Sequence, residues 1–107
     1  MNQLWSPLLE RCGFILKDGT IIEVENKHPT PSISFSIETE SFETYADQIA
    51  IVWHTHPTGF VNLSVADYHA FLLKPEYLHM IIGKTQRAIF QVEDRVVLIR
   101  EFYNGDA

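Results

Sequence analysis

The chain contains short apolar runs, and one segment alternates apolar and polar residues with the period of two that is typical of half-buried strands. Ile33, Phe35 and Ile37 are the apolar members of that segment. Other apolar runs are bounded by turn residues, which also predicts strands. The predicted strands cover residues 13–17, 20–25, 33–37, 49–53, 77–82, 88–92 and 96–102.

Turn residues separate several of these strands. Asp18-Gly19 is a two-residue hairpin signal, and it predicts an antiparallel hairpin in which both turn positions have positive φ. Glu93-Asp94-Arg95 is the predicted turn between the last two strands. Residues 26–32 contain two prolines and are predicted to form a loop.

Three segments favour helices. Residues 4–9 have partly helical spacing, although Pro7 limits that helix. A second helix is predicted over 40–48, where an apolar stripe recurs at helical spacing. Ser64 is a good N-cap for a third helix over 65–72, which ends before Pro75.

Strands and helices in this order predict the α/β class, with a mixed central sheet flanked by helices. The 107 residues suffice for one core, so residues 1–107 are predicted to form a single domain. The composition, 46% hydrophobic and 21% charged, is that of a soluble globular protein. Residues 104–107 are predicted to form a frayed tail.

The charge and the remaining composition exclude several functions. A formal net charge of −6 argues against nucleic-acid and membrane-surface partners, which need clustered Lys and Arg. No secretory signal or membrane span is recognisable, which predicts a cytoplasmic protein. Cys12 is the only cysteine, so no intramolecular disulfide forms, and a buried structural thiol is expected.

Two histidines follow the apolar run 49–53. Side chains two apart on a strand share a face, so His54 and His56 are predicted to project together. Asp67 falls in the first turn of the following helix, at the end that can face the strand terminus. Two histidines and one carboxylate leave a fourth position for water, as in catalytic zinc sites. The sequence therefore predicts one Zn²⁺ per chain, bound by these three residues.

This pattern resembles the signature of a known family. His54-Thr55-His56-Pro57, six further residues and then Ser64-x-x-Asp67 resemble the His-x-His-Pro…Ser-x-x-Asp motif of the JAMM (MPN, Mov34/PAD-1) zinc metallopeptidases. The upstream Glu10-Arg11-Cys12-Gly13 is similar to the family's glutamate segment. The resemblance runs from Glu10 to about Leu72. It implies a curved mixed sheet flanked by helices, of the cytidine-deaminase-like type, with zinc at a strand-to-helix junction.

The resemblance also implies a reaction, the zinc-dependent hydrolysis of a peptide or isopeptide bond. Glu10 would act as the general base toward the attacking water and would return the proton to the leaving amine. The Ser64 hydroxyl would help to stabilise the oxyanion. Glu23 and Glu25 are rival bases, but acids on a polar hairpin face are more often simply solvated.

Other interpretations of the motif stay open. His-x-His on a strand is common without a metal, and Ser64-x-x-Asp67 also fits a capping box that only satisfies the start of a helix. An MPN-type domain can serve as a non-catalytic scaffold in a larger assembly such as a phage tail. Two histidines and a carboxylate also form the facial triad of non-haem iron enzymes.

The resemblance implies a protein or peptide substrate. The compact chain leaves little room for the insertions with which eukaryotic deubiquitinating relatives hold ubiquitin. It is more similar to small prokaryotic and phage members, including the N-terminal domain of lambda K-like tail assembly proteins. The candidate substrates are the C-terminus of a ubiquitin-like protein and a cell-wall peptide. A domain of this size with an exposed site can also form a homo-oligomer.

Three further residues near the motif are not predicted ligands. His69 lies two residues after Asp67 and therefore on a different helix face. His79 lies within an apolar run and is predicted to be a hydrogen-bonded core histidine. Trp53 is predicted to pack on the sheet face opposite to His54.

Overall fold

Six strands form one sheet in the computed structural model, which describes residues 1–105. They are β1 (Cys12–Leu16), β2 (Ile21–Val24), β3 (Ile49–Thr55), β4 (Leu78–Ile82), β5 (Gln86–Glu93) and β6 (Val96–Asn104). Their order in the sheet is β2-β1-β3-β4-β5-β6. Only β3 and β4 pair in parallel, and the other neighbours are antiparallel. The predicted α/β class with a mixed sheet is confirmed.

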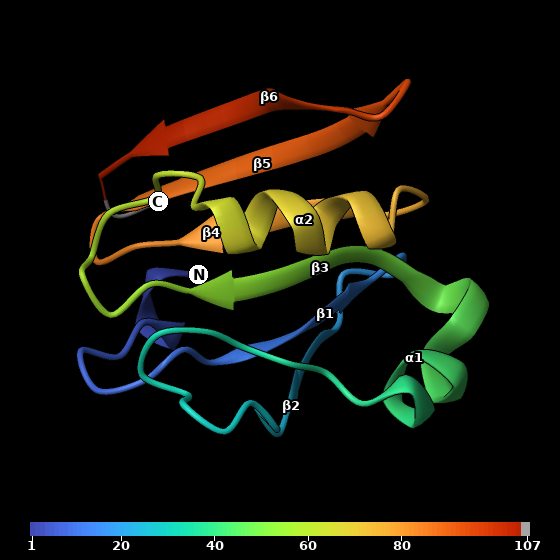
Figure 1. Cartoon of the computed structure of the whole chain (residues 1–107), viewed down its shortest axis with the longest axis horizontal. Coiled ribbons are helices and arrows are strands. Elements are labelled where there is room, and N and C mark those ends of the chain that lie inside the picture. Colours follow the sequence, from blue (N-terminus) through green and yellow to red (C-terminus); the bar gives the residue numbers. More distant parts are fainter. Residues whose placement is uncertain (106–107) are drawn as a thin grey trace.

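Two α-helices accompany the sheet, α1 (Thr39–Tyr45) and α2 (Val65–Leu73), together with the short 3-10 helices η1 (Asn2–Leu4) and η2 (Ala46–Gln48). The helix α2 makes the crossover that a parallel pair requires, and it lies across β3 and β4 (Figure 1). The helix predicted over 4–9 is wrong, because η1 ends before Pro7. The helix predicted over 40–48 is divided between α1 and η2.

The two hairpins have different turns. In the β1–β2 hairpin, Gly19 is the one loop residue with positive φ (91°). The Leu16 carbonyl accepts from the N–H of Gly19, and the Leu16 N–H donates to the carbonyl of Thr20. The loop therefore has three residues with glycine in the left-handed position, and the predicted two-residue turn is wrong. In the β5–β6 hairpin, Asp94 (φ 51°) and Arg95 (φ 64°) form the two-residue turn with both φ positive.

The strand predicted over 33–37 is also wrong, because these residues form a loop. The backbone N–H of Lys27 donates to the Ser36 carbonyl (2.9 Å), and two further hydrogen bonds come from the side chain of Asn26. Its amide nitrogen donates to the Ser34 carbonyl (3.0 Å), and its amide oxygen accepts from the Ser36 N–H (3.0 Å). The alternation in this segment therefore reflects packing without a strand ladder.

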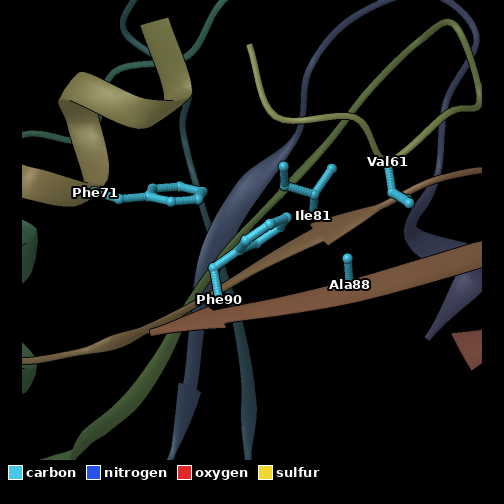
Figure 2. Packing of buried hydrophobic residues seen from close by; sticks show 5 residues of the cluster. All are labelled: Val61, Phe71, Ile81, Ala88 and Phe90. Atoms are coloured by element: carbon cyan, nitrogen blue, oxygen red, sulfur yellow. The ribbon is translucent and has the colours of Figure 1, made fainter. Parts of the chain in front are cut away.

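Apolar residues cover both faces of the sheet. On the face with α2, Phe71 packs against Ile81 of β4 and Phe90 of β5 (Figure 2). On the other face, Trp53 is fully buried beneath the N-terminal segment that contains Trp5. This confirms that Trp53 serves packing on the opposite face from its histidine neighbour.

No helix among residues 1–105 has the length and apolar character needed to cross a membrane. The last strand continues to Asn104, so the prediction that this residue belongs to a tail is wrong. Asp106 and Ala107, which belong to that predicted tail, lie outside the described residues.

Candidate metal centre

The register between β1 and β3 brings Glu10 to the histidines. Cys12 pairs with His54, and the N–H of Thr55 donates to the carbonyl of Arg11 (2.9 Å). Continued by two residues beyond the Cys12–His54 pair, this antiparallel register sets Glu10 opposite His56. The backbone N–H of Glu10 is held by the carbonyl of Pro31 (2.7 Å).

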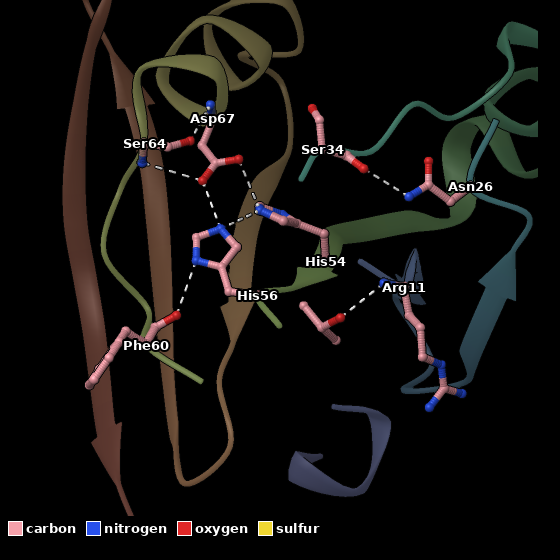
Figure 3. A network of polar contacts seen from close by, with 9 residues as sticks. Arg11, Asn26, Ser34, His54, His56, Phe60, Ser64 and Asp67 are labelled. Carbon is pink, nitrogen blue, oxygen red and sulfur yellow. Dashed lines mark hydrogen bonds and ion pairs between the residues drawn. The ribbon is translucent and has the colours of Figure 1, made fainter. Parts of the chain in front are cut away.

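His54, His56 and Asp67 meet at the end of β3 and the start of α2 (Figure 3). The Nε2 atom of His54 lies 3.0 Å from Oδ1 of Asp67, and Nε2 of His56 lies 2.9 Å from Oδ2. The two Nε2 atoms are 3.2 Å apart. Ligand atoms around a tetrahedral ion with bonds of about 2.0–2.1 Å are separated by roughly 3.3 Å, which is close to these spacings.

Glu10 completes a cluster of four buried residues. One ligand atom from each of Glu10, His54, His56 and Asp67 lies within 4.8 Å of the others. All four residues are buried, with exposed fractions of 0 to 7%. Buried groups of this kind need partners or a bound ion. The cluster could hold a metal ion.

The protonation of His56 supports metal binding. Its Nδ1 lies 3.0 Å from the carbonyl oxygen of Phe60, which can only accept, so Nδ1 carries the proton. If the ring is charged, Nε2–H donates to Oδ2 of Asp67 (2.9 Å). If the ring is neutral, Nε2 presents a lone pair that is free to bind a cation between His56 and Asp67. The Phe60 carbonyl orients the ring for this, as hydrogen-bond acceptors of metal-ligating histidines commonly do.

Burial and the neighbouring charges shift the pKa values of the three proposed ligand residues in opposite directions. Burial favours the neutral form of Asp67, but hydrogen bonds from His54 and His56 outweigh it and hold the pKa of Asp67 well below its usual range. Burial lowers the pKa of His54 more than Asp67 raises it. For His56, burial is outweighed by Asp67 and the pKa is raised. The carboxylate is therefore ionised at neutral pH, as a ligand must be.

Glu10 has the properties of a proton acceptor near neutral pH. Burial raises its pKa from 4.5 to about 7, His56 opposes this rise and Asp67 adds to it. Its Oε1 atom is buried without a hydrogen-bond partner among residues 1–105. A carboxyl group with a pKa near the working pH is suited to general acid–base catalysis.

Ser64 is the N-cap of α2. Its Oγ accepts from the backbone N–H of Asp67 (3.1 Å), and the Asp67 carboxylate accepts from the backbone N–H of Ser64 (3.4 Å). Both halves of a capping box are therefore present, as the alternative interpretation of this pair anticipated. Because Oγ only accepts in this contact, the hydroxyl proton stays available to another partner.

The rival residues lie outside the cluster. Glu23 pairs with Arg11 and Glu25 with Lys27, so neither acid is a candidate base in this structure. His69 is exposed. His79 is buried, and its Nε2 donates to the carbonyl of Lys74 (2.8 Å), which confirms its prediction as a hydrogen-bonded core histidine.

Two residues that the sequence analysis did not assign to the site contact it directly. Phe35 stacks on the ring of His54, with centroids 4.2 Å apart. Trp5 donates its indole N–H to the backbone carbonyl of His56 (2.6 Å). Neither residue belongs to a recognisable motif, so only the tertiary structure reveals these contacts.

Comparison with models of known protein families gives no match for this chain, and comparison with curated proteins gives none. The function is therefore inferred from the geometry of the site and from the spacing of its residues.

Proposed function

We propose that this protein is a zinc-dependent metallopeptidase of the JAMM/MPN type that hydrolyses a peptide or isopeptide bond. The observation that carries the proposal is the buried cluster of Glu10, His54, His56 and Asp67, in which four ligand-type atoms lie within 4.8 Å. The cluster contains the two histidines and one carboxylate of an open zinc site. It also contains a second carboxylate with the pKa of a general base.

Each residue has a separate task in the proposed reaction. His54, His56 and Asp67 hold the ion. Bound Zn²⁺ supplies an activated water and polarises the scissile carbonyl. Glu10 accepts a proton from the attacking water at Oε1, which faces no competing partner in the described structure. It then transfers this proton to the nitrogen of the leaving amine, so that water and amide become acid and amine.

The Ser64 hydroxyl is proposed to donate to the oxyanion that forms on the scissile carbonyl. Its bond to the Asp67 N–H uses oxygen lone pairs only, so capping and donation are compatible. The proposed substrate is a protein or peptide, with the C-terminus of a ubiquitin-like protein and a cell-wall peptide as the two classes to screen.

The first experiment is elemental analysis of protein purified without added metal, comparing the parent chain with His56→Ala. We expect about one zinc per parent chain and none in the variant. Glu10→Gln is the matched control, since it leaves the three proposed ligands intact and should keep zinc while losing hydrolysis. Absence of metal from the parent after zinc is offered would refute the proposal, and iron in place of zinc would favour the facial-triad alternative.

A further inference from the structure

A cavity of about 250 Å³ lies between α2 and the loop that precedes α1, on the sheet face that carries the proposed metal ligands. Its floor includes Val52 of β3 and His79 of β4, which pair across the parallel ladder. Ala70 and Phe71 of α2 line one wall, and Phe35 lines the other. Aromatic and aliphatic side chains therefore form most of its surface.

The cavity adjoins the metal centre through His54. Phe35 stacks on the His54 ring (4.2 Å between centroids), and Phe71 meets that ring edge-on (6.1 Å). Val52 precedes His54 by two residues and therefore shares its face of β3. The two aromatic residues that enclose His54 thus also enclose the cavity.

The lining of the cavity is mostly apolar, and its buried polar side chain, His79, is uncharged at neutral pH. His79 stacks on Phe71 at 4.3 Å, and burial lowers its pKa to about 4, so its ring is neutral at neutral pH. Lys74 holds its ammonium group 4.3 Å above the ring of Phe42 and is only partly buried. An apolar cavity of about 150 Å³ is enough for benzene, so this cavity can hold a larger group.

We propose that this cavity binds a large apolar side chain (leucine, methionine or phenylalanine) of the substrate, close to the scissile bond. The inference rests on the proposed peptidase function, because it assigns the neighbouring space to the same substrate. Phe71 lines the cavity, and its ring lies 6.1 Å from the ring of the proposed ligand His54, so the cavity is next to the site where the bond would be cleaved.

The first test measures binding without requiring hydrolysis. The full chain is titrated with N-acetyl-leucinamide and N-acetyl-alaninamide, and NMR shift changes are followed with and without zinc. We expect the leucine compound to shift signals of Ala70, Phe71 and His79 and to bind at least about tenfold more tightly than the alanine compound. Equal binding of the two compounds, or shifts confined to other residues, would overturn the inference.

Variants separate cavity binding from general damage. Ala70→Phe fills the cavity and should abolish the leucine-induced shifts. Ala66→Phe makes the same change at an exposed position of α2 and should leave them intact. Ala70 also packs against the core, so Ser36→Trp serves as a second cavity variant that blocks the space from an exposed position. Unchanged leucine binding in a folded Ala70→Phe or Ser36→Trp protein would contradict the assignment.

The second test uses cleavage of a peptide mixture by the zinc-loaded chain. We expect kcat/KM to favour leucine over alanine near the scissile bond at least about tenfold, and Ser36→Trp to remove that preference without removing zinc. Cleavage without any such preference would refute the inference while leaving the peptidase proposal intact. If the parent chain neither binds zinc nor cleaves any peptide, the peptidase proposal is refuted, and with it the assignment of the cavity to a substrate.

Discussion

Trp5 donates its indole N–H to the backbone carbonyl of His56 across 2.6 Å. The two residues are 51 positions apart, and the bond ties the N-terminal segment to the loop that follows β3. β4 and the turn after it also hold this loop. The N–H of His56 donates to the carbonyl of Ile82 (3.1 Å), and the N–H of Lys84 donates to the carbonyl of Gly59 (3.0 Å). The position of His56 therefore depends on contacts outside the metal motif.

Replacing Trp5 with phenylalanine should weaken zinc binding. The variant keeps most of the apolar contact but leaves the His56 carbonyl without its donor, and outer-shell changes of this kind typically cost 10- to 100-fold in metal affinity. Competition with a chromophoric chelator measures the affinity. Asn2→Ala is the matched control, because Asn2 anchors the same segment to Gly83 and Gln86 and does not contact the motif. If both variants lose the same amount of zinc affinity, the effect comes from general loosening of the N-terminal segment.

Two glycines allow a matched test of the motif loop. Gly59 (φ 88°) and Gly19 (φ 91°) both have a conformation that costs an alanine roughly 1 kcal/mol or more. We expect both alanine variants to lower the free energy of unfolding by at least that amount, as measured by urea denaturation. Only Gly59→Ala should also weaken zinc binding, because a Cβ there would lie 3.3 Å from the Lys84 side chain and press on the loop.

Glu10 should make the metal-free protein less stable as the pH rises. Its pKa increases from 4.5 to about 7 on folding, so between these values the folded chain binds more protons than the unfolded chain. Stability from this group is therefore present below about pH 4.5 and is lost as the pH rises through 7. Between pH 4 and pH 8, the free energy of unfolding of Glu10→Gln should therefore rise by about 3 kcal/mol relative to that of the parent.

Urea denaturation in the presence of a chelator at several pH values measures this difference for Glu10. Glu43→Gln is the control, because Glu43 is exposed on α1 and lies outside the cluster. If the free energies of unfolding of both variants change with pH in the same way, the pH dependence does not come from burial of Glu10.

Substitutions of Ser64 can separate its two proposed roles. Ser64→Ala removes the N-cap and should lower the free energy of unfolding by about 1 kcal/mol. Ser64→Asp keeps a capping acceptor but has no hydroxyl proton, so it should retain most of the stability. If the hydroxyl stabilises the oxyanion, kcat should fall by about 100-fold or more in both variants at full zinc occupancy. Full activity of Ser64→Asp would restrict Ser64 to capping.

Local patterns predicted most of the sheet. Apolar runs locate the six observed strands. The four central strands, β1, β3, β4 and β5, contain buried residues, whereas the edge strands β2 and β6 are apolar but contain none. The Ser64 cap locates the start of α2. The segment 33–37 misled because Phe35 and Ile37 point inward as strand residues would. Two of its backbone hydrogen bonds are made instead with the side chain of Asn26, which no periodicity reveals.

The motif predicted which side chains converge, but not the groups that orient them. His54, His56 and Asp67 are close in sequence, so strand and helix geometry alone could bring them together. Glu10 reaches them only through the register of β1 and β3. The carbonyl of Phe60 is a backbone group, and its residue type carries no signal of the contact with His56.

The β1–β3 ladder limits where the chain can change in length. Because side chains alternate, a slip of one residue would turn Glu10 to the opposite face of the sheet. A slip of two would restore the face but move Glu10 about 7 Å along the strand, beyond the 4.8 Å that spans the cluster. Insertions or deletions are therefore excluded within the paired parts of β1 and β3, because the number of ladder steps fixes the distance between Glu10 and the proposed ligands.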